Sequence, residues 1–153
     1  MLIVQKYGGT SVGTIERIHG VADRVGKAHK DGHRVVVVLS AMSGETDRLL
    51  RLAHEVTPLP DDRELDMLLS TGERVTIALL AMALRARGSD AHSFTGRPVG
   101  IMTDTAPPKA RINRGSAGRS REALINAFIS EVAGVQGISE QSVFRRLGSG
   151  GPV

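Results

Sequence analysis

The chain has 153 residues, of which 41% are hydrophobic and 24% are charged, so it is long enough to bury a core as one domain. It contains no cysteine, which excludes disulfides, thiolate catalysis and cysteine-ligated zinc. The formal net charge of +4 comes from residues 109–147, where seven basic residues face three acidic ones, but only 3% of all residues are aromatic and a nucleic-acid interface is not favoured.

The first predicted elements form a βαβ unit. Residues 2–4 are a continuous apolar run, which is typical of a strand buried on both faces at the centre of a parallel sheet. Apolar residues recur at helical spacing over residues 15–28, and four consecutive valines indicate a second buried strand over 34–39. Such a unit has parallel strands, and ligands bind beyond their carboxyl ends, where Lys6 and Ser40 fall.

Helices and short strands are expected next. Thr46 can cap a helix that runs to Ala53, and further helices are predicted over 63–69 and 73–87. Residues 91–95 and 99–103 have the composition of short strands.

We expect one domain in two parts. Residues 1–112 form its α/β core, and residues 113–153 continue it in a divergent, partly irregular way. The second part contains an irregular stretch, a helix and two weaker strands, expected over residues 113–120, 121–129, 132–137 and 142–147.

The turn after the first strand has the residues of an anion site. Lys6 ends the strand, and Gly8 and Gly9 let backbone N–H groups approach a ligand and tolerate positive φ. Thr10 and Ser11 then offer caps for the helix that follows. Together these features predict an anion cradle, although a plain strand-to-helix turn with a solvated lysine has the same pattern.

Four stretches carry a family resemblance. Residues 6–13 read Lys-Tyr-Gly-Gly-Thr-Ser-Val-Gly, which resembles the N-terminal signature of aspartate kinases within the amino-acid kinase family. Residues 36–47, 70–76 and 109–112 resemble further motifs of the same family in the same order. The resemblance implies an α/β fold, a three-layer αβα sandwich with a mainly parallel sheet.

The resemblance also implies a function. The reaction would be the ATP-dependent phosphorylation of the side-chain carboxylate of L-aspartate to 4-phospho-L-aspartate, the first step towards lysine, threonine and methionine, with Mg²⁺ brought by the nucleotide. It implies that Lys6 is the catalytic residue and that Thr46 and Glu73 bind the substrate. The expected phosphate-binding set is Lys6, Tyr7, Gly8, Gly9 and Ser40.

The resemblance becomes patchy after residue 112. An arginine of the family's later motif falls on Ser149 and an aspartate on Val153, so the chain looks truncated or degenerate and is expected to be a poor catalyst alone. Two alternatives stay open: a kinase for glutamate or a nucleoside monophosphate, and a non-catalytic remnant that binds a kinase subunit through an exposed sheet edge. The Ser-Thr-Gly-Glu stretch favours aspartate.

Partners and compartment follow from the same reading. ATP and L-aspartate are the expected ligands, and a homo-oligomer is expected, with no nucleic acid, membrane or protein-bound metal. His29 and His33 are separated by Asp31-Gly32, which breaks the helix, so a shared metal face is not expected. No apolar run reaches the roughly 18 residues of a membrane span, and the N-terminus lacks a signal-peptide layout, which predicts a cytoplasmic protein.

Overall fold

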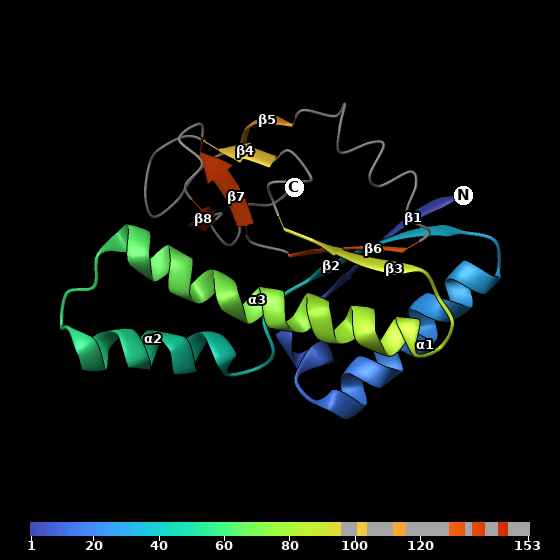
Figure 1. Ribbon diagram of the computed structural model, residues 1–153, viewed down its shortest axis with the longest axis horizontal. Coiled ribbons are helices and arrows are strands. Elements are labelled where there is room, and N and C mark those ends of the chain that lie inside the picture. Colours follow the sequence, from blue (N-terminus) through green and yellow to red (C-terminus); the bar gives the residue numbers. More distant parts are fainter. Residues whose placement is uncertain (96–100, 104–111, 116–128, 134–135, 140–143, 147–153) are drawn as a thin grey trace.

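The computed structural model describes residues 1–95, 101–103, 112–115, 129–133, 136–139 and 144–146 (Figure 1). Two four-stranded sheets run in the orders β1-β2-β6-β3 and β5-β4-β7-β8. The first sheet is entirely parallel and consists of β1 (Leu2–Tyr7), β2 (Arg34–Leu39), β6 (Ile129–Ala133) and β3 (Ala91–Phe94). The second is mixed and consists of β5 (Ile112–Gly115), β4 (Ile101–Thr103), β7 (Gln136–Ser139) and β8 (Phe144–Arg146).

The described helices gather on one side of the first sheet. They are the 3-10 helix η1 (Gly9–Val12) and the α-helices α1 (Ile15–Lys30), α2 (Glu45–Val56) and α3 (Asp62–Arg85). In Figure 1, α1 and α3 lie below the first sheet, α2 packs against α3, and the second sheet lies above. The predicted α/β fold with a mainly parallel sheet is confirmed.

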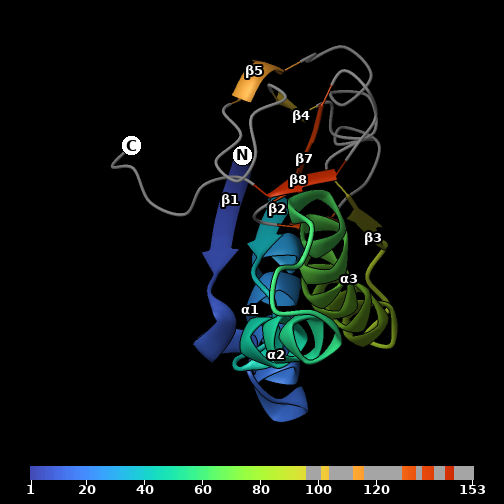
Figure 2. The same cartoon turned by 90° about the vertical axis from the view of Figure 1, so that its left-hand side faces the viewer.

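The predicted βαβ unit is present. β1 and β2 pair in parallel, with Lys6 opposite Val38 and Tyr7 opposite Leu39, and α1 connects them. The expectation that β1 is buried on both faces is wrong, because alternate side chains of the strand are exposed, and β1 is also an outer strand of its sheet among the described residues (Figure 2). Nothing described covers one of its faces, so Leu2 and Val4 are 53% and 64% exposed.

The core forms where α1 and α3 meet the sheet. α1 begins after Thr14, whose hydroxyl accepts a hydrogen bond from the Arg17 backbone N–H at 3.2 Å. α1 buries one apolar face, as its helical periodicity predicts. α3 is nearly all apolar over residues 75–84, which predicts a well-buried helix, but Val75 and Met82 are exposed. The central buried residues are Ile18, Val21, Val25, Val35, Val37, Leu39, Ile77, Leu80 and Leu84.

One helix replaces two predicted ones. The helices expected over 63–69 and 73–87 are a single 24-residue helix, α3, so Glu73 lies in its middle and not at a helix start. Ser70 and Thr71 do not break it, because their hydroxyls donate to the backbone carbonyls of Met67 and Leu68 at 2.8 and 2.7 Å. Such hydroxyls can bond back to the preceding turn while the backbone continues as a helix.

The start of α2 also differs from the prediction. Gly44 is its N-cap, with φ of +78°, and Thr46 is the second residue of the helix. The left-handed conformation at Gly44 turns the chain two residues earlier than a cap at Thr46 would, since glycine adopts positive φ without steric cost.

Differences in the later part are small. The stretch expected to be irregular over 113–120 begins with strand residues, because β5 extends to Gly115. The strand predicted over 132–137 is two strands, β6 and β7, whereas β3, β4 and β8 fall on predicted strands. The helix expected over 121–129 lies outside the described residues, except that Ile129 begins β6.

By length and composition, α3 is apolar enough to cross a membrane, but 56% of its most apolar window is buried within the fold, and a core helix passes the same test.

Truncating the core should destabilise the chain strongly. Leu84 on α3 is fully buried, so we expect Leu84→Ala to lower the free energy of unfolding by about 2–5 kcal/mol, measured by urea denaturation. Met82 on the same helix is 65% exposed, and Met82→Ala should change the free energy of unfolding by less than about 0.5 kcal/mol. Equal losses for the two variants would contradict this packing.

Candidate functional site

The turns that follow β1 and β2 touch each other. The Ser40 backbone N–H donates to the Tyr7 carbonyl oxygen at 3.2 Å. A Cβ built on Gly9 would lie 2.9 Å from the Ala41 carbonyl oxygen, and one on Gly13 would lie 3.1 Å from the Ser43 Cβ. A side chain at Gly9 would therefore collide with backbone, and a glycine there allows the two turns to meet.

The reason for the glycines differs from the one expected. Gly8 has φ of −78° and ψ of 170°, an extended conformation open to any residue. None of Gly8, Gly9 and Gly13 is among the described glycines with positive φ. Close approach of backbone to backbone, and not a left-handed conformation, is what Gly9 provides.

The middle of α3 reaches the same place. A Cβ on Gly72 would lie 3.1 Å from the Ala41 Cβ and 3.3 Å from the Glu45 Cγ. Glu73, the next residue, is buried with 6% exposure. The structure thus brings α3 at the Gly72–Glu73 step against the turn after β2 and the start of α2, which carries Thr46.

Lys6 presents an open cation at this end of the sheet. It is exposed, and it forms no ion pair with any residue in the described part of the chain. Gly8 and Gly9 follow directly, and Gly9 begins η1. An uncompensated ammonium next to a helical turn suits an anionic ligand such as a phosphate.

Thr46, unlike the buried Glu73, lies in an open environment. Thr46 is exposed in the first turn of α2, and the N-cap residue of this helix, Gly44, has no side chain to cap it. Glu45 beside it is engaged by Arg48, whose Nε and Nη2 donate to its two carboxylate oxygens at 2.9 and 2.8 Å. These bonds lower the pKa of Glu45 below its ordinary value, so its carboxylate stays ionised.

Tyr7 is half-buried just before the glycines. Its hydroxyl donates to Gln5 Oε1 at 3.0 Å. Burial raises the pKa of the Tyr7 phenol, and the positive charge of Arg24 partly offsets that rise. Tyr7 therefore stays neutral, and its hydroxyl is a donor at neutral pH.

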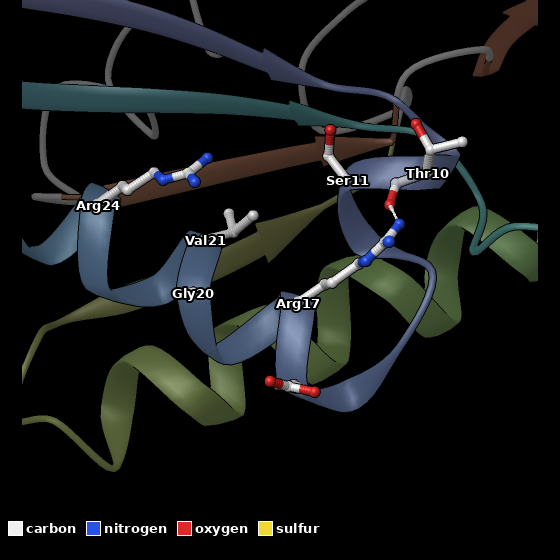
Figure 3. Close-up of a pocket in the computed structure, with 7 residues that line it drawn as sticks. Thr10, Ser11, Arg17, Gly20, Val21 and Arg24 are labelled. Atoms are coloured by element: carbon white, nitrogen blue, oxygen red, sulfur yellow. Dashed lines mark hydrogen bonds between the residues drawn. The ribbon is translucent and has the colours of Figure 1, made fainter.

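A cavity of about 650 Å³ lies between η1 and α1 (Figure 3). Arg17 points from α1 toward η1 and donates to the Thr10 carbonyl oxygen. Arg24 lies on the same helix, seven residues after Arg17. Sequence reasoning missed both arginines, although their spacing of seven residues places them on one helix face. The cavity is lined by Thr10, Ser11, Glu16, Arg17, Gly20, Val21 and Arg24.

None of the predicted catalytic, phosphate-binding or substrate-binding residues lines this cavity, although Thr10 and Ser11 of the predicted cradle do. The acidic Glu16 borders it beside the two arginines. No group of three or more His, Asp or Glu side chains within the described residues could hold a metal ion.

The sequence matches one family over nearly its whole length. A profile of the Amino acid kinase family covers residues 1–150, and the chain belongs to this family. The aspartate kinase of Stutzerimonas stutzeri is 53% identical over 150 residues, which are 98% of this chain and 36% of that protein. The aspartokinase of Thermus thermophilus is 48% identical over 98% of this chain and 37% of its own length. The chain thus spans just over a third of these curated relatives.

Solved structures agree on the fold. The aspartate kinase of Synechocystis is 43% identical, with a TM-score of 0.77 over 99% of this chain and 24% of that one. Aspartokinase III of E. coli, solved in complex with aspartate and ADP, is 22% identical, with a TM-score of 0.78 over 99% of this chain and 44% of that one. The second likeness concerns the fold alone.

The environment of Tyr7 can be tested directly, because it is the only tyrosine and the chain has no tryptophan. Removing the opposing charge by Arg24→Ala should raise the pKa of Tyr7 further, measured by tyrosinate absorbance. As the pH rises through the ordinary tyrosine pKa, the unfolded chain releases its proton before the folded one, so the free energy of unfolding should fall. The exposed Arg51→Ala on α2 is the control, and an unchanged Tyr7 pKa in Arg24→Ala would contradict the contact.

Proposed function

We propose that this chain forms part of an ATP-dependent aspartate kinase, with ATP and L-aspartate as its ligands and 4-phospho-L-aspartate and ADP as products. The observation that carries the proposal is the meeting of three segments: the turn after β1, the turn after β2, and α3 at Gly72–Glu73. The aspartate kinase relatives, similar over 98% of the chain, support it. Neither a glutamate or nucleotide kinase nor a non-catalytic remnant has an observation of its own.

In this proposal the β1 and β2 turns receive the phosphates. A carboxylate oxygen of aspartate attacks the γ-phosphorus of ATP, the bond to the bridging oxygen breaks, and ADP leaves with the electron pair. Phosphoryl transfer depends mainly on positioning and charge stabilisation. Lys6 supplies a positive charge, Gly8 and Gly9 supply backbone N–H donors, and the Ser40 hydroxyl adds a further donor.

Tyr7 and the metal complete the phosphate side. Tyr7 contributes its backbone, whose carbonyl oxygen holds the Ser40 N–H and so joins the two turns. Mg²⁺ brought with the nucleotide would neutralise part of the charge of the phosphates beside Lys6.

The amino-acid end is assigned to α2 and α3. Glu73 offers a buried carboxyl group for the ammonium group of aspartate. Thr46 offers its hydroxyl at the start of α2, where uncapped N–H groups and the helix dipole favour a carboxylate. A cytoplasmic location and assembly into a homo-oligomer belong to the same proposal.

Lys6 is the residue whose loss should matter most for nucleotide. A charge-assisted hydrogen bond contributes about 1.5–3 kcal/mol, so Lys6→Ala should raise the Kd for MgATP by roughly 10- to 150-fold, measured by calorimetry. Lys30→Ala, an exposed lysine at the far end of α1, should leave it unchanged.

Product formation tests the whole proposal. Hydroxylamine traps an acyl phosphate, so wild-type chain with ATP, Mg²⁺ and L-aspartate should form aspartyl hydroxamate faster than the Lys6→Ala variant. Equal rates in the two proteins, or MgATP affinity independent of Lys6, would remove the assigned role.

A further inference from the structure

One helical glycine is packed unlike the others. Gly20, Gly26 and Gly72 all lie within α-helices, and a Cβ added at Gly20 or Gly26 would meet nothing within 4 Å. At Gly72 the added atom would lie 3.1 Å from Ala41 Cβ, with Glu45 Cγ at 3.3 Å and Leu49 Cδ1 at 3.5 Å. A glycine inside a helix is destabilising relative to alanine, so Gly72 costs helix stability at a place where its missing side chain lets two segments approach.

The residues that Gly72 faces are themselves packed closely against the β1 turn. Ala41 also packs closely on the β1 turn, because its carbonyl oxygen would lie 2.9 Å from a Cβ built on Gly9. Ser43 is similarly close to the same turn, since its Cβ would lie 3.1 Å from a Cβ built on Gly13. Segment 41–43 therefore packs against both the glycines of the β1 turn and Gly72, which limits how far it can shift.

We propose that Gly72 is a positioning residue that sets the spacing between Glu73 and the segment carrying Ser40 and Thr46. The inference rests on the proposed function for its ligand and deepens it. Glu73 follows Gly72 directly, Ser40 precedes Ala41, and Thr46 follows Glu45. A methyl group at position 72 pushes α3 away from this segment by a few tenths of an ångström, and with it the residue assigned to the substrate ammonium.

The consequence should be larger for the amino acid than for the nucleotide. The amino acid contacts both Glu73 on α3 and Thr46 on α2, so its affinity depends on the distance between these two residues. Lys6, Gly8 and Gly9 all belong to β1 and the turn after it, so their positions relative to one another stay unchanged. A misplacement of about 1 Å can cost about 100-fold, so we expect a loss of aspartate affinity on the order of tenfold for this smaller shift.

A double-mutant cycle tests the inference on the full chain. The variants are Gly72→Ala, Ala41→Gly and the two combined, with Gly26→Ala as the control because Gly26 is also a buried helical glycine. Titration with L-aspartate and with MgATP gives the two affinities. Gly72→Ala should weaken L-aspartate binding much more than MgATP binding, and Gly26→Ala should change neither.

Adding Ala41→Gly to Gly72→Ala removes the closest contact and should recover most of the lost aspartate affinity. The proposal is overturned if Gly72→Ala binds aspartate as the wild type does, or if Ala41→Gly recovers nothing. Should Gly72→Ala fail to fold, the combined variant must fold and bind aspartate, and its failure is equally decisive.

If the wild-type chain binds neither ligand, the proposed function fails, and the positioning role is judged separately. Amide hydrogen exchange over residues 40–45 should then become faster in Gly72→Ala and return toward the wild-type rate when Ala41→Gly is added. The reason is that the added methyl group loosens the packing of this segment on α3, and removing the Ala41 methyl group restores it. Exchange that does not respond to Gly72→Ala overturns the positioning role.

Discussion

The close packing around Ala41 is the constraint on which the candidate site depends. Backbone atoms of the β2 turn leave no room for a Cβ at Gly9 in the β1 turn, and the side chains of Ala41 and Glu45 leave little room for one at Gly72 in α3. Protein interiors are packed densely enough that such contacts fix relative positions and transmit displacement. The Ser40–Tyr7 hydrogen bond joins the β1 turn to the β2 turn. Lys6, Ser40 and Glu73 therefore lie on segments that are packed directly against one another.

The parallel pairing of β1 and β2 explains why these segments meet at all. A parallel pair requires a crossover, and α1 supplies it while burying its apolar face against β2 and α3. Both strands then end at the same edge, where chain direction changes and side chains become available to a ligand. The core thus places the site, while the glycines determine how tightly its parts close.

Much of this arrangement is predictable from local pattern. The apolar runs at residues 2–4 and 34–39 and the helical periodicity of residues 15–28 indicate the βαβ unit, and the motif around Lys6 points to its ligand edge. The continuity of α3 is not predictable in this way, because Ser70, Thr71 and Gly72 are weaker helix formers than alanine or leucine. The hydroxyls of Ser70 and Thr71 bond back to the preceding turn, and Gly72 lies where Ala41 and Glu45 pack closely on the helix.

Non-local features escape the sequence for a related reason. β6 enters the first sheet between β2 and β3 although it lies some 35 residues after β3, and no local signal specifies that neighbour. The outer position of β1 among the described strands is likewise a property of which strands pair, whereas its apolar composition alone suggested the centre. Gly9 shows the same limit at atomic scale, since its letter is equally compatible with a left-handed turn and with close backbone approach.

The two residues assigned to the amino acid differ in how firmly they are held. Glu73 is buried in the middle of a 24-residue helix packed into the core, whereas Thr46 is exposed in the first turn of a helix that buries only Leu49. Groups on rigid, packed elements keep their geometry better than groups near exposed helix ends. In the proposed site, the group assigned to the ammonium is therefore the more rigid of the two, and the group assigned to the carboxylate adjusts to it through the start of α2. The close approach at Gly72 joins α3 to Ala41 and to Glu45 at the start of α2, so a change there alters the distance between these two groups.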